Sequence, residues 1–192
     1  MSDREAFPHF MLKEIFEQPR ALEAAISSRV SLPDSEIRIG HEVHIAEDEL
    51  RALRRINIVA SGTSRHAGMA GQYMFQDLLH LFADVDYASE YEYRNPPIGP
   101  EEITIVITQS GETSDTLAAQ RLARRKGSRT IAITNVVKST VAKEADGVLY
   151  THAGPEISIA STKAFTAQMA VLFLLSIYLG QVRGSLSREA LH

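Results

Sequence analysis

One stretch of the chain, residues 103–127, holds an apolar run, a hydroxyl-rich turn, a helical pattern and a glycine in succession. Residues 103–107 are mostly β-branched, which is typical of a strand buried on both faces. Residues 108–113 are polar and include a glycine, so they cannot extend that strand. From Ser114, which can cap the first turn, the pattern is helical, and Gly127 is a natural stop. A buried strand that turns through hydroxyls into a helix start predicts an α/β unit with an anion site at the turn.

The rest of the regular chain repeats this alternation. We expect strands at residues 56–60, 85–88, 103–107, 130–134 and 147–150, and helices at residues 67–81, 114–126, 139–145 and 163–179. Strands that alternate with helices predict a parallel sheet covered on both faces, that is, a three-layer α/β/α sandwich. Five strands suggest the order 2-1-3-4-5, in which strands one and three are neighbours at the switch point.

The N-terminal part of the chain is predicted to be a helical lead-in to this fold. Residues 11–29 have helical spacing of apolar side chains, and Pro19 predicts a kink or two short helices. We expect an irregular connection at residues 31–40 with a turn at Pro33, and a short helix capped by Asp48. The expected divisions are a lead-in at 1–45, an α/β domain at 46–182 and a polar tail at 183–192.

Two loops are predicted to meet at the switch point. Residues 61–66 and 108–113 are the loops richest in small hydroxyl residues and glycine. Ligands of such folds bind outside the carboxyl ends of the strands at this point, so topology and composition indicate the same crevice. The second loop has no lysine or arginine, while Glu112 and Asp115 lie close by. This favours one phosphate monoester over a polyphosphate; the alternative is that these residues only form caps and turns.

Several common kinds of site are not indicated. The chain has no P-loop, no G-x-G-x-x-G and no nucleophile elbow. It has no cysteine, which excludes disulfides, thiolate metal sites and cysteine nucleophiles. His41 and His44 would need a helix and further ligands to bind a metal, so we expect no metal and no cofactor.

Charge and hydrophobicity limit the classes of partner that the chain could bind. The formal charge of −4 at pH 7 does not favour nucleic acid or an acidic membrane surface. The first ten residues include acids and lack the apolar core of a signal peptide. The most apolar stretch, residues 169–179, is too short to span a bilayer. We therefore expect a cytoplasmic protein that binds neither nucleic acid nor membrane.

Four separated motifs indicate a family. They read S-G-T-S from Ser61, T-Q-S-G-E-T-S-D-T-L from Thr108, I-T-N-V-V-K-S-T from Ile133 and T-H-A-G-P-E-I-S-I-A-S-T-K-A-F-T-A-Q from Thr151. With H-F-M-L-K-E-I-F-E-Q-P from His9, they resemble the first sugar isomerase (SIS) module of the glutamine–fructose-6-phosphate aminotransferase family. The resemblance covers about residues 9–181 and implies the SIS-type, flavodoxin-like fold.

The resemblance also implies which residues bind substrate. The phosphosugar, fructose-6-phosphate or glucosamine-6-phosphate, would contact Thr63, Ser64, Thr108, Gln109, Ser110, Thr113, Ile159 and Ser161. The chain departs from the family pattern at a few positions. Ser61 stands where cysteine is usual, Arg65 where an aromatic is common, and Ser158 and Ile159 where glycine and valine are usual. Thr108 replaces a usual serine but keeps the hydroxyl group.

The resemblance further implies what the chain lacks. The family's glutaminase cysteine is absent, and its catalytic histidine, glutamate and lysine belong to a second SIS module and the tail after it. Isomerisation needs a base at C1–C2, and the resemblance gives that role to neither Glu112 nor Glu156. We therefore assign no catalytic residue and expect a binding module that is incomplete for catalysis alone. It could be an excised piece, a truncated product or a subunit.

Such a module would work with a second SIS module or a homodimer partner. Whether the chain is an enzyme by itself stays open. One alternative is a non-catalytic sugar-phosphate sensor. The other is a stand-alone phosphosugar isomerase that uses Glu156 or His152.

Overall fold

The computed structural model describes residues 7–186, with a five-stranded sheet at its centre. The strands are β3 (Arg55–Ala60), β4 (Phe82–Tyr87), β5 (Glu102–Thr108), β6 (Arg129–Thr134) and β7 (Gly147–Tyr150). They lie in the order β4-β3-β5-β6-β7, and every neighbouring pair is parallel. In chain order this is 2-1-3-4-5, so the predicted topology is confirmed.

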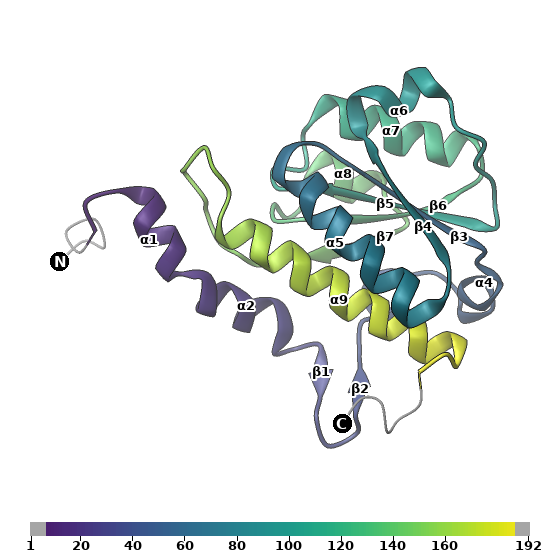
Figure 1. Cartoon of the computed structure of the whole chain (residues 1–192), viewed down its shortest axis with the longest axis horizontal. Coiled ribbons are helices and arrows are strands. Elements are labelled where there is room, and N and C mark those ends of the chain that lie inside the picture. The colour runs from purple at the N-terminus through teal and green to yellow at the C-terminus, as the bar shows by residue number, and fades with distance from the viewer. Residues whose placement is uncertain (1–6, 187–192) are drawn as a thin grey trace.

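Helices cover both faces of the sheet (Figure 1). On one face lie α5 (Gly62–Leu79) and α9 (Lys163–Arg183), and on the other α6 (Ala88–Arg94), α7 (Ser114–Arg125) and α8 (Thr140–Glu144). Successive side chains of a strand point to opposite faces. Ile58 and Ile105 therefore pack in the core under α5 and α9, while Val59 and Val106 pack in the smaller core under α7. The predicted three-layer sandwich is confirmed.

Two element boundaries differ from the prediction around β4. Helix α5 begins at Gly62, not at residue 67, because Ser61 is extended and Gly62, at φ 56°, turns the chain directly into the helix. Residues 61–66 are thus mostly helical rather than a loop. Strand β4 begins earlier than predicted although it contains Asp84 and Asp86. It is an edge strand, and the two carboxylates pair with Arg55 and Arg94.

The N-terminal segment is more regular than predicted. Pro19 lies in the first turn of the second of two short helices, α1 (Phe10–Phe16) and α2 (Gln18–Ile26), which confirms the interruption. The predicted irregular connection contains a small antiparallel hairpin of β1 (Val30–Ser31) and β2 (Glu36–Ile37). After α3 (Gly40–Val43), helix α4 (Glu47–Ala52) begins before Asp48. That residue therefore lies in the first turn, where its charge suits the helix dipole, and is not the cap.

Helix α9 differs in length from the prediction. It runs through Gly180 to Arg183 and ends at Gly184, whose φ is 71°. A side chain at residue 180 would meet Leu186 at 2.5 Å, so this glycine permits close packing rather than ending the helix. Among residues 7–186, α9 is the one helix long and apolar enough, by length and composition alone, to span a membrane, because it extends on both sides of the apolar stretch 169–179. Half of its most apolar window is buried, and it packs against α5 and α2 as a core helix.

Buried Arg29 joins the lead-in to the sheet. Its guanidinium donates to both carboxylate oxygens of Glu42, at 2.8 and 2.6 Å. It also donates to the carbonyl oxygens of Ala25 in α2 and Tyr150 at the end of β7, at 2.9 and 2.8 Å. The predicted division at residue 45 remains a proposal, and its lead-in and tail reach residues 1–6 and 187–192, which lie outside the described residues.

Removing this cation should destabilise the whole fold. We expect Arg29→Ala to lower the free energy of unfolding in urea by about 3–5 kcal/mol, since it leaves a largely buried carboxylate and two carbonyls unpaired. The matched control is Arg38→Ala, whose ion pairs with Asp34 and Glu36 are exposed. That change should leave the stability almost unchanged, because exposed ion pairs contribute little. Equal losses in the two variants would contradict the role given to Arg29.

Candidate functional site

A cavity of about 200 Å³ lies at the carboxyl ends of β3 and β5. Its lining comes from both predicted loops and the helices after them: Ser61, Ser64, Ile107, Thr108, Gln109, Ser110, Thr113 and Thr116. Strands β3 and β5 are paired up to Ala60 and Ile107, so the residues that follow each strand meet at one point. The predicted crevice is therefore present at the switch point of the sheet.

Two helices begin at this cavity. α5 starts at Gly62 and α7 at Ser114, so both positive dipole ends lie beside it. In the described chain, neither N-cap residue, Ser61 or Thr113, makes a side-chain capping hydrogen bond. The predicted cap, Ser114, is the first helical residue instead. Amides of the first turns thus remain available to an anion.

The turn after β5 is held by its own hydroxyl groups. Thr108 Oγ1 and Thr113 Oγ1 are 3.0 Å apart, and the Gly111 amide donates to Thr108 Oγ1 at 3.3 Å. The Glu112 amide donates to Ser110 Oγ at 3.2 Å. Gly111 has φ 70°, and a Cβ there would lie 2.1 Å from Ser139 Oγ. Only glycine fits this position, and the turn presents an exposed Ser110 hydroxyl that can still donate its proton.

Two buried hydroxyl groups belong to the cavity wall. Ser64 Oγ accepts a hydrogen bond from Gln168 Nε2 at 3.0 Å. Thr116 Oγ1 is buried and has no hydrogen-bond partner among residues 7–186. Sequence reasoning missed both Thr116 and Gln168. The position of Thr116, one turn after the hydroxyl-rich loop, could have indicated it, whereas no local signal pairs Gln168 with Ser64.

Three predicted substrate residues do not line the cavity as the described chain forms it. Thr63 is exposed on the first turn of α5, and Ile159 is fully exposed in the loop between β7 and α9. Ser161 donates to a carboxylate oxygen of Glu156 at 2.9 Å. The structure thus brings together Ser64, Thr108, Gln109, Ser110 and Thr113 at one cavity. The substrate-binding roles of all eight residues stay predictions.

Three carboxylates hold the loop between β7 and α9, residues 151–162, and the first turn of α9. Glu156 accepts bonds from the Thr162 and Ala164 amides at 2.8 and 3.2 Å, which caps α9. Buried Glu14 accepts the Ile157 amide at 2.6 Å. Glu17, the residue after α1, pairs with Lys163 at the start of α9, at 2.6 Å between Nζ and the carboxylate. These bonds hold the loop beside the N-terminal helix.

The pKa values of Glu14 and Glu17 reflect these contacts. Burial alone would raise the pKa of Glu14, but hydrogen bonds from Ser158 and Ile157 outweigh burial and lower it below its usual 4.5. The hydrogen bond from Lys163 lowers the pKa of Glu17. Lys163 is buried in this pair and so neither reaches the cavity nor is solvated. Both carboxylates are therefore charged parts of the fold at neutral pH.

Charge around the cavity is low. Within the described chain, none of the residues that line it is a lysine or an arginine. Arg65, which stands where an aromatic is common in the family, lies with its guanidinium carbon 3.9 Å from the centre of the Tyr87 ring. No group of three or more histidine, aspartate or glutamate side chains in residues 7–186 is placed to hold a metal ion. The cavity thus offers hydroxyls, amides and helix dipoles.

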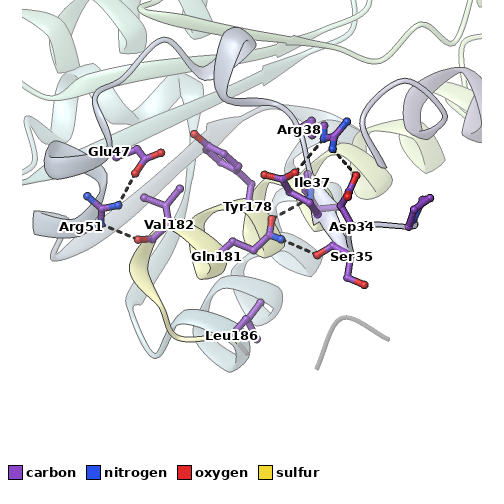
Figure 2. A pocket seen from close by; sticks show the side chains of 12 residues that line it. Asp34, Ser35, Ile37, Arg38, Glu47, Arg51, Tyr178, Gln181, Val182 and Leu186 are labelled. Carbon is purple, nitrogen blue, oxygen red and sulfur yellow. Dashed lines mark hydrogen bonds and ion pairs between the residues drawn. The ribbon is translucent and has the colours of Figure 1, made fainter. Parts of the chain in front are cut away.

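A larger hollow of about 630 Å³ lies between the β1–β2 hairpin and the end of α9 (Figure 2). Its two arginines are engaged within the chain: Arg38 pairs with Asp34 and Glu36, and Arg51 pairs with Glu47. The charged groups there neutralise one another instead of converging on a ligand. We therefore place the candidate site at the smaller cavity between β3 and β5.

Comparison with known proteins shows the family of the chain. A family model for the SIS domain matches residues 49–178, which include every strand of the sheet and the whole cavity lining. The chain belongs to the SIS-domain family.

Relatives of this SIS domain extend well beyond it. It is 45% identical over 190 residues to the glutamine–fructose-6-phosphate aminotransferase (isomerizing) of Clostridium tetani, and 49% identical over 183 residues to that of Symbiobacterium thermophilum. The alignments cover 99% and 95% of the chain but only 31% and 30% of the relatives. The C-terminal domain of glucosamine-fructose-6-phosphate aminotransferase from Francisella tularensis superposes with TM-score 0.91 and 33% identity. That match covers 100% of the SIS domain chain and 53% of the other. The resemblance seen in the motifs is confirmed.

The SIS domain should not tolerate a side chain at the centre of its turn. We expect Gly111→Ala to lower the free energy of unfolding in urea by about 2–4 kcal/mol, because alanine is strained at positive φ and would clash with Ser139. Gly99→Ala is the control, since a Cβ at residue 99 meets no atom of the described chain within 4 Å. Similar stability of the two variants would show that the turn can relax.

The SIS domain should also lose stability in acid through Glu14. Because the pKa of Glu14 is lower in the folded chain than its usual value, its contribution is complete above that value and is lost as pH falls through the folded pKa. We expect Glu14→Gln to be about 1 kcal/mol less stable at neutral pH and to lose less stability than wild type below roughly pH 5. Glu23→Gln, at an exposed position of α2, should follow wild type in both measurements. If the free energy of unfolding fell equally with decreasing pH in wild type and Glu14→Gln, Glu14 would not make this contribution.

Proposed function

We propose that this chain is a phosphosugar-binding module of a glutamine–fructose-6-phosphate aminotransferase and binds fructose-6-phosphate or glucosamine-6-phosphate. The observation that supports the proposal is the cavity between β3 and β5. Hydroxyl groups of Ser64, Thr108, Ser110 and Thr113 line it, and two helices begin beside it. The relatives are named for an enzyme of fructose-6-phosphate, and the family similarity covers the whole site.

The chemistry of the lining suits a single phosphate group. Each hydrogen bond from a neutral donor to a charged oxygen contributes about 1.5–3 kcal/mol, and two helix N-termini add their dipoles. Because none of the described lining residues is cationic, the charge of a polyphosphate would be poorly balanced. The residues proposed to bind the phosphosugar are those predicted from the sequence, with Thr63, Ile159 and Ser161 nearer the sugar.

The module is proposed to be incomplete for catalysis by itself. Isomerisation needs a base near C1–C2 of the sugar. Glu112 accepts the Thr140 amide at 2.8 Å, and the hydrogen bonds from Thr140 lower the pKa of Glu112. Glu156 is occupied by the amides at the start of α9. Both carboxylates already accept hydrogen bonds within the fold, which disfavours a stand-alone isomerase and supports a base from another module.

That module is proposed to be a second SIS module or a homodimer partner in the cytoplasm. The chain matches 53% of the Francisella tularensis domain, which leaves room in such a protein for another module of similar size. Helix α1 extends away from the sandwich in Figure 1, and its apolar side chains Phe10, Met11 and Phe16 are exposed. An apolar projection of this kind suits packing against another protein module.

Binding can be measured directly by calorimetry with fructose-6-phosphate. We expect saturable binding to the wild-type chain. Ser110→Ala should weaken it by about 1–3 kcal/mol, because one donor to a charged oxygen is lost. Ser89→Ala, at an exposed position of α6, should leave affinity unchanged. Absence of heat with wild type at millimolar sugar phosphate would sink the proposed function, and equal affinity of wild type and Ser110→Ala would exclude that residue from the site.

A further inference from the structure

Gln168 lies in the middle of the core helix α9, yet its side chain reaches the wall of the cavity. It is 2% exposed, and its Nε2 donates to Ser64 Oγ at 3.0 Å. Ser64 is itself buried and lines the cavity. This hydrogen bond joins α9 to the first turn of α5, two helices packed on the same face of the sheet. A buried side chain outside the cavity thus touches one of its hydroxyl groups.

The direction of this bond decides what Ser64 can do. A serine hydroxyl has one proton to donate and two lone pairs. Because Gln168 Nε2 donates to it, Ser64 does not spend its own proton on Gln168. Gln168 Oε1 is buried without a partner in the described chain. If the side-chain amide of Gln168 were flipped, Oε1 would gain a partner in Ser64, but both N–H donors of Nε2 would lose theirs. Buried donors without a partner are rarer than buried acceptors without one.

We propose that Gln168 is a positioning residue, which holds Ser64 so that its hydroxyl proton points into the cavity as a donor to a phosphate oxygen. The inference rests on the proposed function and extends it by a residue that does not touch the ligand. A hydroxyl group that rotates freely can donate to a ligand or accept from it. A hydroxyl group that already accepts a hydrogen bond from an amide is oriented to donate. In a site without cations, such preset donors favour a phosphate over the neutral hydroxyls of a sugar.

The chain contains a closely matched control residue. Gln120 in α7 is 0% exposed, its Nε2 donates to the Val141 carbonyl oxygen at 3.1 Å, and its Oε1 also lacks a partner in the described residues. It differs from Gln168 in that its donor bond goes to a backbone carbonyl and not to a residue of the cavity. Substitution at Gln120 therefore reports the general effect of changing a buried glutamine.

The test measures binding of fructose-6-phosphate and of inorganic phosphate to the full chain by calorimetry. Gln168→Glu keeps the shape but, as a carboxylate, only accepts; it should draw the Ser64 proton away from the cavity and weaken both ligands about tenfold or more. In the Ser64→Ala background the same change should have less than about a twofold effect. Gln168→Leu, which removes the bond without adding charge, should weaken binding in wild type and again have no effect with Ser64→Ala. Gln120→Glu and Gln120→Leu should bind like wild type.

Each other result overturns the inference in a recognisable way. If Gln168→Glu weakens binding equally with and without Ser64→Ala, the effect is electrostatic or structural and does not act through Ser64. If wild type binds and the Gln168 variants bind equally well, the positioning role is wrong while the proposed function stands. If wild type binds neither fructose-6-phosphate nor inorganic phosphate, the proposed function falls and this inference falls with it. Should Gln168→Glu not fold, Gln168→Leu decides between the same outcomes.

Discussion

The parallel pairing of β3 with β5 is the constraint on which the candidate site depends. Both strands are buried, and their register aligns Ala60 with Ile107 at the last paired position. A shift by one residue would turn every side chain of a strand to the wrong core, so the register is strongly specified. The segments that leave the two strands must therefore emerge side by side. Each turns directly into a helix, and two sets of first-turn amides and hydroxyls are brought to one cavity.

Neutral donors at this point give the site its chemical character. Gly111 lets the chain fold tightly after β5, and the hydrogen bonds around Thr108 and Thr113 fix the turn before any ligand binds. Preorganised donors of this kind need little rearrangement when an anion arrives. Across the cavity, Ser64 is fixed by Gln168. Recognition of a phosphate would thus depend on rigid dipoles, and the ion pairs of the described chain serve mainly to hold its elements together.

Local pattern and topology rules predict much of this arrangement. The β-branched runs and their alternation with helices are enough for the sheet order and the crevice, because buried parallel strands leave a strong signal. The start of α5 was missed because hydroxyl residues and glycine favour loops, although here Ser61 and Gly62 turn the chain within two residues. Contacts such as Gln168 with Ser64, 104 residues apart, cannot be read from helical spacing, which indicates only that a residue lies on α9. Ile159 and Ser161, beyond the cavity, came from the family resemblance alone, whereas Thr63 belongs to the hydroxyl-rich segment 61–66.

The long-range contacts also change how the chain should be divided. Glu14 of α1 holds the loop before α9, Glu17 pairs with Lys163 at the start of α9, and Arg29 holds the end of β7. α2 packs on α9, the same helix from which Gln168 reaches Ser64. The N-terminal lead-in, although it lies far in sequence from the site, therefore packs against the helix that supports one wall of the cavity. Helix α9 packs against α2 and carries Gln168, which donates to Ser64. A change that moves the lead-in should therefore shift the Ser64 hydroxyl group through α9.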